Sequence, residues 1–456
     1  MTKEKALKAM IGLEIHSYIL TGEKLFCKCK ASREKGLKPN THVCPICSGQ
    51  PGAKPMLANE EAVRKAVAIG LMLGCKINHN LPWQRKHYDW PDMPKGYQTT
   101  LSGKYAVPVG EKGNYNGIGI WSMHLEEDPA SWEPSTGCVD YNRSGLPLVE
   151  IVTAPDFSSS EEVMAWMKKL VLALSYLKAV DSNAGLKADV IVNLDGVTER
   201  VEIKNISSIE DIGRAIDYEL ERQIKEGSVR ETRRFDSVKG KTVRMRGKEE
   251  AEDYRFITDP DLKDIVIDAK FVEQIKESLP ESPEEKLSKL VKKYKIDKQN
   301  AEVLAKNIDV VEFFEKVADK IDAKFTLPWV TVELLRFLNY NKKKLDEVSV
   351  DAGHFAALLK MVKEGKITEL QGKGILNKFY PKSFDPTKNV AEKISDEKEL
   401  GGIAEKVIAG NAKAVSDYKG GDANALNFLM GKIMEATQKR ADFKVAREVL
   451  LRLLKK

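Results

Sequence analysis

The sequence predicts an α+β protein, in which a mixed or antiparallel sheet is followed by helices. Apolar and polar residues alternate with period two in well-separated stretches of the first half, as in half-buried strands. Beyond about residue 283 helical patterns dominate, and glycine becomes sparse until about residue 400. We therefore expect a sheet domain over residues 1–288, an all-α domain over 289–395 and a small helical tail module over 396–456.

Length and composition set the broad class. The chain has 456 residues, 31% of them charged, which is enough for roughly two to four domains. Its net charge of +6 is spread along the chain, so an acidic partner such as RNA is permitted but not required. Six cysteines do not suggest a disulfide scaffold and favour a reducing cytoplasm. We see no signal peptide and no apolar run that could span a membrane.

The first alternating stretch covers residues 10–19. Isoleucines and a leucine form one face, and Glu14 and His16 project together from the other. A buried structural His–Glu pair is one interpretation, and a functional pair is the other.

The stretch around which the chain is organised covers residues 121–152. Glu126 ends an alternating run, Glu127 and Asp128 follow it, and Glu150 lies in a second apolar run. Adjacent carboxylates repel one another and are costly to bury, and a hard cation such as Mg²⁺ removes that cost. The alternative is a solvated acidic strand end.

Two cysteine pairs predict a metal site. Cys27 and Cys29 are separated by fourteen intervening residues from Cys44 and Cys47, the spacing of a zinc knuckle with four thiolate ligands. Four protein ligands leave no open position, so the zinc would be structural. Four unrelated buried thiols are the alternative, and His42 is a second candidate ligand.

Three helices are expected within the sheet domain, over residues 59–73, 158–178 and 207–226. The side chains that would cap them are Asn59, Ser159 with Glu162, and Ser207 with Glu210. Gly227 would end the third helix.

Two other stretches of this domain are polar. Residues 84–99 have no period and predict a functional loop, in which Lys95 could meet a phosphate. Residues 229–262 are polar and strand-like, and they include a charged segment with Lys248, Glu249, Glu250, Asp253 and Arg255. That segment is either a solvated hairpin or part of a binding site.

The helical part carries basic runs at residues 289–298 and 339–344. These are either solvated helix faces or contacts with nucleic acid. Asp422 and Asp442 are expected to cap two helices of the tail, the first with an apolar stripe at helical spacing. A small helical module of this kind favours recognition over catalysis.

Taken together, the motifs resemble those of the B subunits of aspartyl/glutamyl-tRNA amidotransferases. The matching stretches are GLEIH (12–16), CKC…CPICSGQPGAKP (27–55), DWPDMPKGYQ (89–98), HLEEDP (124–129), DYNRSGLPLVEIV (140–152), VEIKNISS (201–208), ETRRFD (231–236), MRGKEEAEDYRF…DPDL (245–262) and NAKAVSDYKGGDANALNFLMGKIMEAT (411–437). The chain departs from many relatives at residues 187–193 and at Ile257. It also has no room for the inserted domain of the related archaeal E subunits.

The resemblance implies a cradle-like catalytic domain and a reaction. The γ-phosphate of ATP would be transferred to the side-chain carboxylate of misacylated Asp-tRNA(Asn) or Glu-tRNA(Gln), and ammonia would then displace phosphate. A partner A subunit would release the ammonia from glutamine, and a small C subunit would join A to B.

Motif matches assign the site residues. Those expected to hold or surround Mg²⁺ are Glu14, His16, Glu126, Glu127 and Glu150, and those expected to contact substrate or nucleotide are Lys95, Asp128 and Arg255. No P-loop is present, so ATP must be held by another device. Two other functions stay open, a zinc-containing tRNA-binding protein without catalysis and a stand-alone ATP-dependent ligase acting on a small acid.

Overall fold

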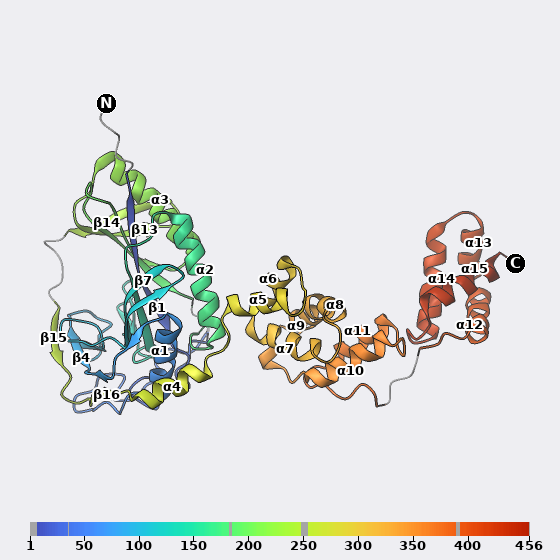
Figure 1. The fold of residues 1–456 in the computed structure, drawn as a ribbon, viewed down its shortest axis with the longest axis horizontal. Coiled ribbons are helices and arrows are strands. Elements are labelled where there is room, and N and C mark those ends of the chain that lie inside the picture. The colour runs from blue at the N-terminus through green and yellow to red at the C-terminus, as the bar shows by residue number, and fades with distance from the viewer. Residues whose placement is uncertain (1–6, 35, 182–184, 248–253, 389–392, 456) are drawn as a thin grey trace. The chain divides into compact units, whose positions relative to one another are not determined.

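The computed structural model describes residues 7–34, 36–181, 185–247, 254–388 and 393–455. The chain divides into two compact units, Met1–Ser282 and Pro283–Lys456. The first unit contains a large sheet with helices, and the second is helical (Figure 1). The predicted α+β class with a mixed sheet is therefore confirmed. None of the helices in the described ranges is long and apolar enough to cross a membrane.

Twelve strands within the described residues form one sheet. Ten follow the order β14-β13-β12-β11-β1-β10-β7-β5-β4-β15, and β6 pairs with both β2 and β7. Only β12 and β13 are parallel neighbours among these pairs. The bounds are β1 Ala9–Tyr18, β2 Lys76–Ile77, β4 Gln84–His87, β5 Tyr97–Thr100, β6 Gly110–Tyr115, β7 Ile118–Glu127, β10 Pro147–Thr153, β11 Lys187–Leu194, β12 Val201–Ile206, β13 Glu231–Asp236, β14 Lys241–Gly247 and β15 Arg255–Thr258. Short ladders pair β3 (Asn80–Leu81) with β16 (Ile265–Val266) and β8 (Ser131–Glu133) with β9 (Cys138–Asp140).

Helices cover one face of the sheet. Alternation along β1 sends Ile11, Leu13 and Ile15 to this face, where all three are fully buried in the main core. Helices α1 (Glu60–Met72), α2 (Ser160–Tyr176) and α3 (Ile209–Glu226) contribute apolar residues to the same core, and α4 (Ala269–Ser278) packs on α1. The opposite face carries Glu14 and His16 of β1, Glu126 of β7 and Glu150 of β10.

The predicted helix starts are mostly confirmed. Asn59 caps α1 by accepting a hydrogen bond from Ala62 N, and Gly227 ends α3 with a positive φ of 71°. Ser159 caps α2 as expected, but Glu162 accepts from Ser158 rather than completing a capping box. The cap of α3 is one residue later than predicted.

That cap is Ser208, whose hydroxyl accepts from Asp211 N. The prediction of Ser207 was wrong because two adjacent serines are each followed three residues later by an acidic side chain. Which of the two serines caps the helix depends on the backbone conformation at each, and the sequence pattern does not give that conformation.

Residues 84–99 are not an irregular loop throughout. Their two ends form β4 and β5, which pair antiparallel from Gln84 opposite Thr100 to His87 opposite Tyr97. β4 contains no apolar residue, so an alternation of apolar and polar residues could not reveal this strand in the sequence. Stacking stabilises the hairpin instead, with the Arg85 guanidinium 4.4 Å from the centre of the Tyr97 ring.

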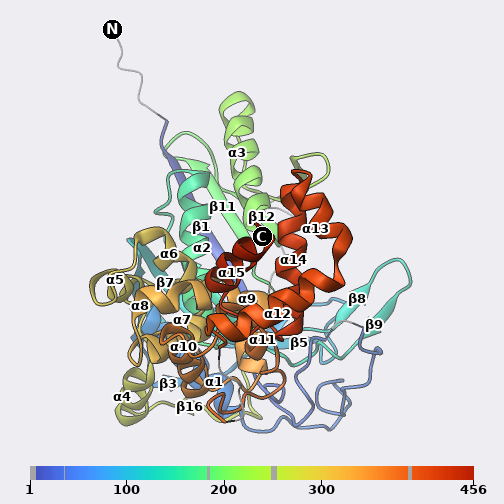
Figure 2. The same cartoon turned by 90° about the vertical axis from the view of Figure 1, so that its right-hand side faces the viewer.

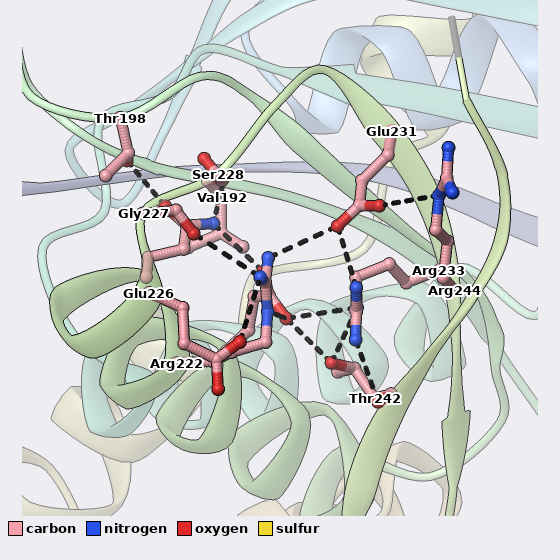
Figure 3. Close-up of polar contacts among 12 residues, drawn as sticks. Val192, Thr198, Arg222, Glu226, Gly227, Ser228, Glu231, Arg233, Thr242 and Arg244 are labelled. Carbon is pink, nitrogen blue, oxygen red and sulfur yellow. Dashed lines mark hydrogen bonds and ion pairs between the residues drawn. The ribbon is translucent and has the colours of Figure 1, made fainter.

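A buried ion network fixes the far edge of the sheet to α3 (Figure 3). Glu231 of β13 accepts from Arg233 at 2.7 Å and from Arg244 at 3.1 Å, and it lies 3.4 Å from Arg222 of α3. Glu219, which has no solvent exposure, accepts from Arg222 at 2.5 Å and from Thr242 at 2.7 Å. The hairpin of β13 and β14 is thus tied to the helix by charge as well as by packing.

Among the described residues of the second unit, every named element is a helix. Their bounds are α5 Pro283–Lys292, α6 Lys298–Ala305, α7 Ile308–Ala318, α8 Ala323–Pro328, η2 Trp329–Leu334, α9 Leu335–Tyr340, η3 Leu345–Glu347, α10 Ala352–Lys363, α11 Glu369–Asn377, α12 Glu397–Gly410, α13 Ala412–Lys419, α14 Ala423–Ala436 and α15 Phe443–Leu454. Figure 2 shows these last four helices as a group. Asp422 caps α14 and Asp442 caps α15, as predicted.

Residues 394–454 share a hydrophobic cluster of their own. It includes the predicted stripe of α14, in which Leu429 and Ile433 are fully buried. Lysines of both basic runs pair with carboxylates of this unit, for example Lys289 with Glu315 at 3.0 Å in the first run and Lys343 with Glu347 at 3.7 Å in the second. These pairs favour the interpretation of the basic runs as solvated helix faces.

Candidate functional site

The polar face of the sheet is the floor of an open cavity with a volume of about 980 Å³. Residues two apart on a strand share a face, so each strand contributes alternate side chains. The strand residues that line the cavity include Glu14, His16 and Tyr18 (β1), Lys86 (β4), Glu126 (β7), Leu148 and Glu150 (β10), Lys187 and Asp189 (β11), and Glu202 and Lys204 (β12). Most of them are charged, as a site for a polar substrate requires.

Three of the expected metal ligands lie together. His16, Glu126 and Glu150 each offer a ligand atom, and these atoms lie within 4.8 Å of one another. They come from neighbouring strands, because β10 lies between β1 and β7 with Glu150 opposite His16. Glu126 is 5% exposed, and its Oε2 accepts from Thr100 Oγ1 at 3.1 Å. We call these three residues the central cluster.

Burial and mutual charge shift the pKa values of all three residues of the central cluster. Burial and the nearby charge of Glu150 raise the pKa of Glu126 to about 7. Burial opposes the charged forms of His16 and Glu150, but their interaction across 3.8 Å outweighs it, so the pKa of His16 rises to about 9 while that of Glu150 falls. Two buried carboxylates and an imidazole are a donor set that fits a divalent cation.

Glu14 belongs to a different group. Its ligand atom lies within 4.8 Å of those of Asp189 and Glu202, and Glu14 is directly opposite Asp189 in the sheet. Lys204 already neutralises part of this group, since its Nζ lies 2.7 Å from Asp189 and 2.5 Å from Glu202. Burial and then Glu150 raise the pKa of Glu14. The single metal site expected from the sequence is thus divided into two adjacent acidic groups.

Glu127 and Lys95 lie outside the cavity lining. Glu127 follows Glu126 on the same strand, so it points to the other face, where its Oε1 accepts from Lys95 Nζ and from Thr99 N. This pair fixes the segment that precedes β5. Neither side chain belongs to the central cluster or lines the cavity, so the expected role of Glu127 at the metal finds no support here, while contact of Lys95 with substrate or nucleotide stays a prediction.

Asp128 does line the cavity, on its wall. It accepts from the Tyr18 hydroxyl at 2.6 Å and pairs with Arg143 Nε at 3.2 Å. Burial raises the pKa of Asp128, although Arg143 opposes the shift. Arg255 is exposed at the start of β15, and Tyr254 rather than Arg255 lines the cavity.

Sequence patterns missed several cavity residues. Lys86 and Lys187 line the cavity, and no carboxylate of the described residues lies within 4.0 Å of either ammonium. Lys86 Nζ lies 4.4 Å from the centre of the Tyr254 ring. Alternation alone could have placed Lys187 on the face of Asp189 and Lys204 on that of Glu202. These cations suit an anionic substrate.

The four cysteines of the predicted zinc knuckle converge. Their sulfurs lie within 4.8 Å of one another, with Cys44 3.9 Å from Cys47 and Cys47 4.0 Å from Cys29. Sulfurs at the corners of a zinc tetrahedron lie about 3.8 Å apart, given Zn–S bonds of about 2.3 Å. The geometry fits four thiolate ligands, and His42 is not part of this group.

The chain matches two protein-family models. The GatB/GatE catalytic domain matches residues 9–273, which contain the cavity and the cysteines. The GatB domain matches residues 312–454.

Several curated proteins are similar to this chain over almost its whole length. The aspartyl/glutamyl-tRNA(Asn/Gln) amidotransferase B subunit of Methanocaldococcus jannaschii is 43% identical, with 99% of this chain and 98% of that protein covered. The proteins of the same name from Methanopyrus kandleri and Methanobrevibacter smithii are 40% and 39% identical, over 98% and 95% of this chain and 97% of each relative. With two family models and such relatives along its length, the chain belongs to the family of aspartyl/glutamyl-tRNA(Asn/Gln) amidotransferase B subunits.

Proposed function

We propose that this chain activates and amidates the side-chain carboxylate of misacylated Asp-tRNA(Asn), Glu-tRNA(Gln) or both. It does so as the B component of a complex with a glutaminase A subunit and a small C subunit, in the cytoplasm that its free cysteines favour. The observation that carries the proposal is the cavity, whose lining contains the central cluster together with Lys86 and Lys187. No carboxylate of the described residues lies within 4.0 Å of either ammonium.

The reaction has two steps that balance. A carboxylate oxygen of the aminoacyl group attacks the γ-phosphorus of ATP, and ADP leaves. Ammonia then attacks the carbonyl carbon of the acyl phosphate, the C–O bond breaks, and inorganic phosphate leaves with the amide formed. Phosphoryl transfer of this kind depends mainly on positioning and charge neutralisation, with little covalent chemistry by the protein.

The cavity residues divide these tasks. His16, Glu126 and Glu150 would hold Mg²⁺, which when bound supplies positive charge beside the transferring phosphoryl group. Lys86 and Lys187 bind phosphate oxygens, and Arg143 and Asp128 orient the substrate at the cavity wall. Because the first step brings two anions together, the positive side chains lower its barrier by offsetting their repulsion.

Amide formation by the reconstituted complex tests the function. The purified chain with its A and C partners receives glutamine, ATP and each misacylated tRNA separately, and amidated product is scored. We expect product and ADP only when tRNA is present. A chain that binds tRNA without ATP turnover would be a binding module, and activity on free aspartate or glutamate without tRNA would indicate the stand-alone ligase.

The zinc knuckle makes a prediction of its own. We expect one zinc per chain in freshly purified protein, measured by elemental analysis, and a Cys44→Ser variant that binds less zinc and unfolds at a lower temperature, because metal binding adds to folding free energy. Cys138→Ser is the matched control, since Cys138 is exposed and lies outside the cysteine group. Protein without zinc would contradict the prediction.

The tail module predicts a separable contact with tRNA. Truncation before residue 396 removes most of the cluster at residues 394–454. We expect weaker tRNA binding in a filter assay and an unchanged unfolding transition of the first unit, because the two units have distinct internal contacts. If the truncated chain binds tRNA as tightly as the full chain, the module does not contribute to tRNA affinity.

A further inference from the structure

Lys24 is a lysine buried beside the zinc knuckle. Its side chain is 1% exposed, and its Nζ lies 3.4 Å from Cys47 Sγ and 3.1 Å from the carbonyl oxygen of Tyr141. No carboxylate of the described residues lies within 4.0 Å of this ammonium. A buried cation without an anion is costly, so an anionic partner is required among the groups that it touches.

The cysteine group supplies that anion when it holds a metal. Four thiolates around one Zn²⁺ carry a net charge of −2, and Lys24 lies against one of them. The ammonium and the metal-bound thiolates therefore stabilise each other, as outer partners of metal ligands generally do. Loss of zinc would remove the fixed negative group that Lys24 contacts through Cys47 Sγ.

The turn that Lys24 contacts is bonded to the knuckle along its length. The Asn142 carboxamide accepts from the backbone N–H groups of Thr41 and His42, both at 2.8 Å, and donates to Lys38 O at 2.8 Å. Ser144 Oγ donates to Cys47 O at 2.7 Å. Asn142 and Ser144 are buried, so their side chains are held in place on the turn side of these bonds.

The same turn also forms part of the cavity wall. Arg143 lies between Asn142 and Ser144 and pairs with Asp128 at 3.2 Å. Gly145 N donates to Asp128 O at 2.9 Å, and Asp128 N donates to Leu146 O at 2.8 Å. A shift of the turn would therefore move the backbone of Asp128 and its partner Arg143 together.

We propose that Lys24 is a positioning residue that couples the zinc-thiolate group to the placement of Arg143 and Asp128 on the cavity wall. The proposal deepens the function proposed above and rests on it for the kinetic consequence only. The zinc knuckle then determines the shape of the substrate cavity, in addition to stabilising the fold.

Lys24→Met, which keeps an unbranched side chain one atom shorter and removes its charge, tests the proposal in the complex with the A and C subunits. We expect zinc to pass to a chromophoric chelator about 10- to 100-fold faster, and amide formation to slow by about the same factor. Lys28→Met is the matched control, because Lys28 belongs to the same segment but is 73% exposed and pairs with Glu23 at 2.7 Å. It should match the unmodified chain in both assays.

A double-variant cycle shows whether Lys24 acts through Arg143. In an Arg143→Met background, Lys24→Met should still accelerate zinc loss but should cost little further activity. An equal loss of activity in both backgrounds, or zinc retention equal to that of Lys28→Met, overturns the proposal.

Hydrogen exchange on the unmodified chain tests the coupling between the zinc site and the cavity wall. This test remains valid even if the variants fail to fold or the complex makes no amide. Removing zinc with a chelator should raise amide exchange over residues 141–146, while α2 stays protected. Unchanged exchange over residues 141–146 overturns the coupling. Absence of amide formation by the unmodified complex, with the exchange result as expected, overturns the proposed reaction and leaves the coupling intact.

Discussion

Replacing Glu126 with glutamine is expected to lower carboxylate activation at least about 100-fold. The substitution preserves the shape of the side chain and removes one of two anions from the central cluster, whose ligand atoms lie within 4.8 Å of one another. If the bound cation stabilises the transition state, losing an anionic ligand costs several kcal/mol, and each 1.36 kcal/mol is about tenfold in rate. Phosphate release from ATP in the presence of misacylated tRNA measures the effect.

Two controls distinguish a specific loss of carboxylate activation in Glu126→Gln from a general folding defect. Glu111→Gln changes a partly exposed glutamate of β6, which lies 3.6 Å from Lys112 and outside the cavity, and it should leave turnover near normal. Filter binding of tRNA by the Glu126→Gln variant should barely change, because phosphate contacts with cations dominate such binding. Near-normal turnover would exclude Glu126 from the site, and parallel loss of turnover and binding would indicate misfolding.

The first unit shows which parts of a site can be predicted from a sequence. Alternation along a strand decides which side chains share a face, so Glu14 and His16 are correctly placed opposite the apolar residues of β1. The same rule separates Glu126 from Glu127. Grouping those two adjacent acids in one site ignores the alternation that defines the strand.

Register between distant strands could not be predicted. Whether Glu14 or His16 lies opposite Glu150 depends on how β1 pairs with β10, and a shift by two residues would exchange them. Asp189 joins the site because β11 pairs on the other side of β1. No local pattern contains this information, so the division into two acidic groups required the structure.

Strands made of polar residues could not be predicted from the sequence either. β4 reads Gln-Arg-Lys-His, and hydrophobic periodicity has nothing to detect there. Its side chains are held by rings and carboxylates instead, as Arg85 is by Tyr97 and by Asp259 at 3.0 Å. Lys86 reaches the cavity from this strand, so a cation of the candidate site was missed together with the strand that carries it.

Replacing Glu219 with glutamine is expected to lower the free energy of unfolding of the first unit by about 3–5 kcal/mol. Glu219 is fully buried and lies 2.5 Å from Arg222 and 3.5 Å from Arg233. Both guanidinium groups are largely buried too, so removing the carboxylate charge leaves them undercompensated where water cannot screen them. The loss of stability comes from the buried guanidinium groups that remain without an anion. For this reason, removing one partner destabilises the fold by more than the whole network stabilises it.

Glu226→Gln is the control on the same helix. Glu226 lies 3.8 Å from the same Arg222, but its side chain is 68% exposed, so its loss should cost less than about 1 kcal/mol. Denaturant unfolding followed by tryptophan fluorescence reports mainly on the first unit, since Trp329 alone of the six tryptophans lies in the second. If Glu219→Gln and Glu226→Gln have equal free energies of unfolding, water or a local rearrangement must stabilise the charges of Arg222 and Arg233 in place of Glu219. A loss confined to Glu219→Gln would show that buried charge, more than the number of ion pairs, holds β13 and β14 against α3 and so fixes Thr232 and Met245 at the edge of the cavity.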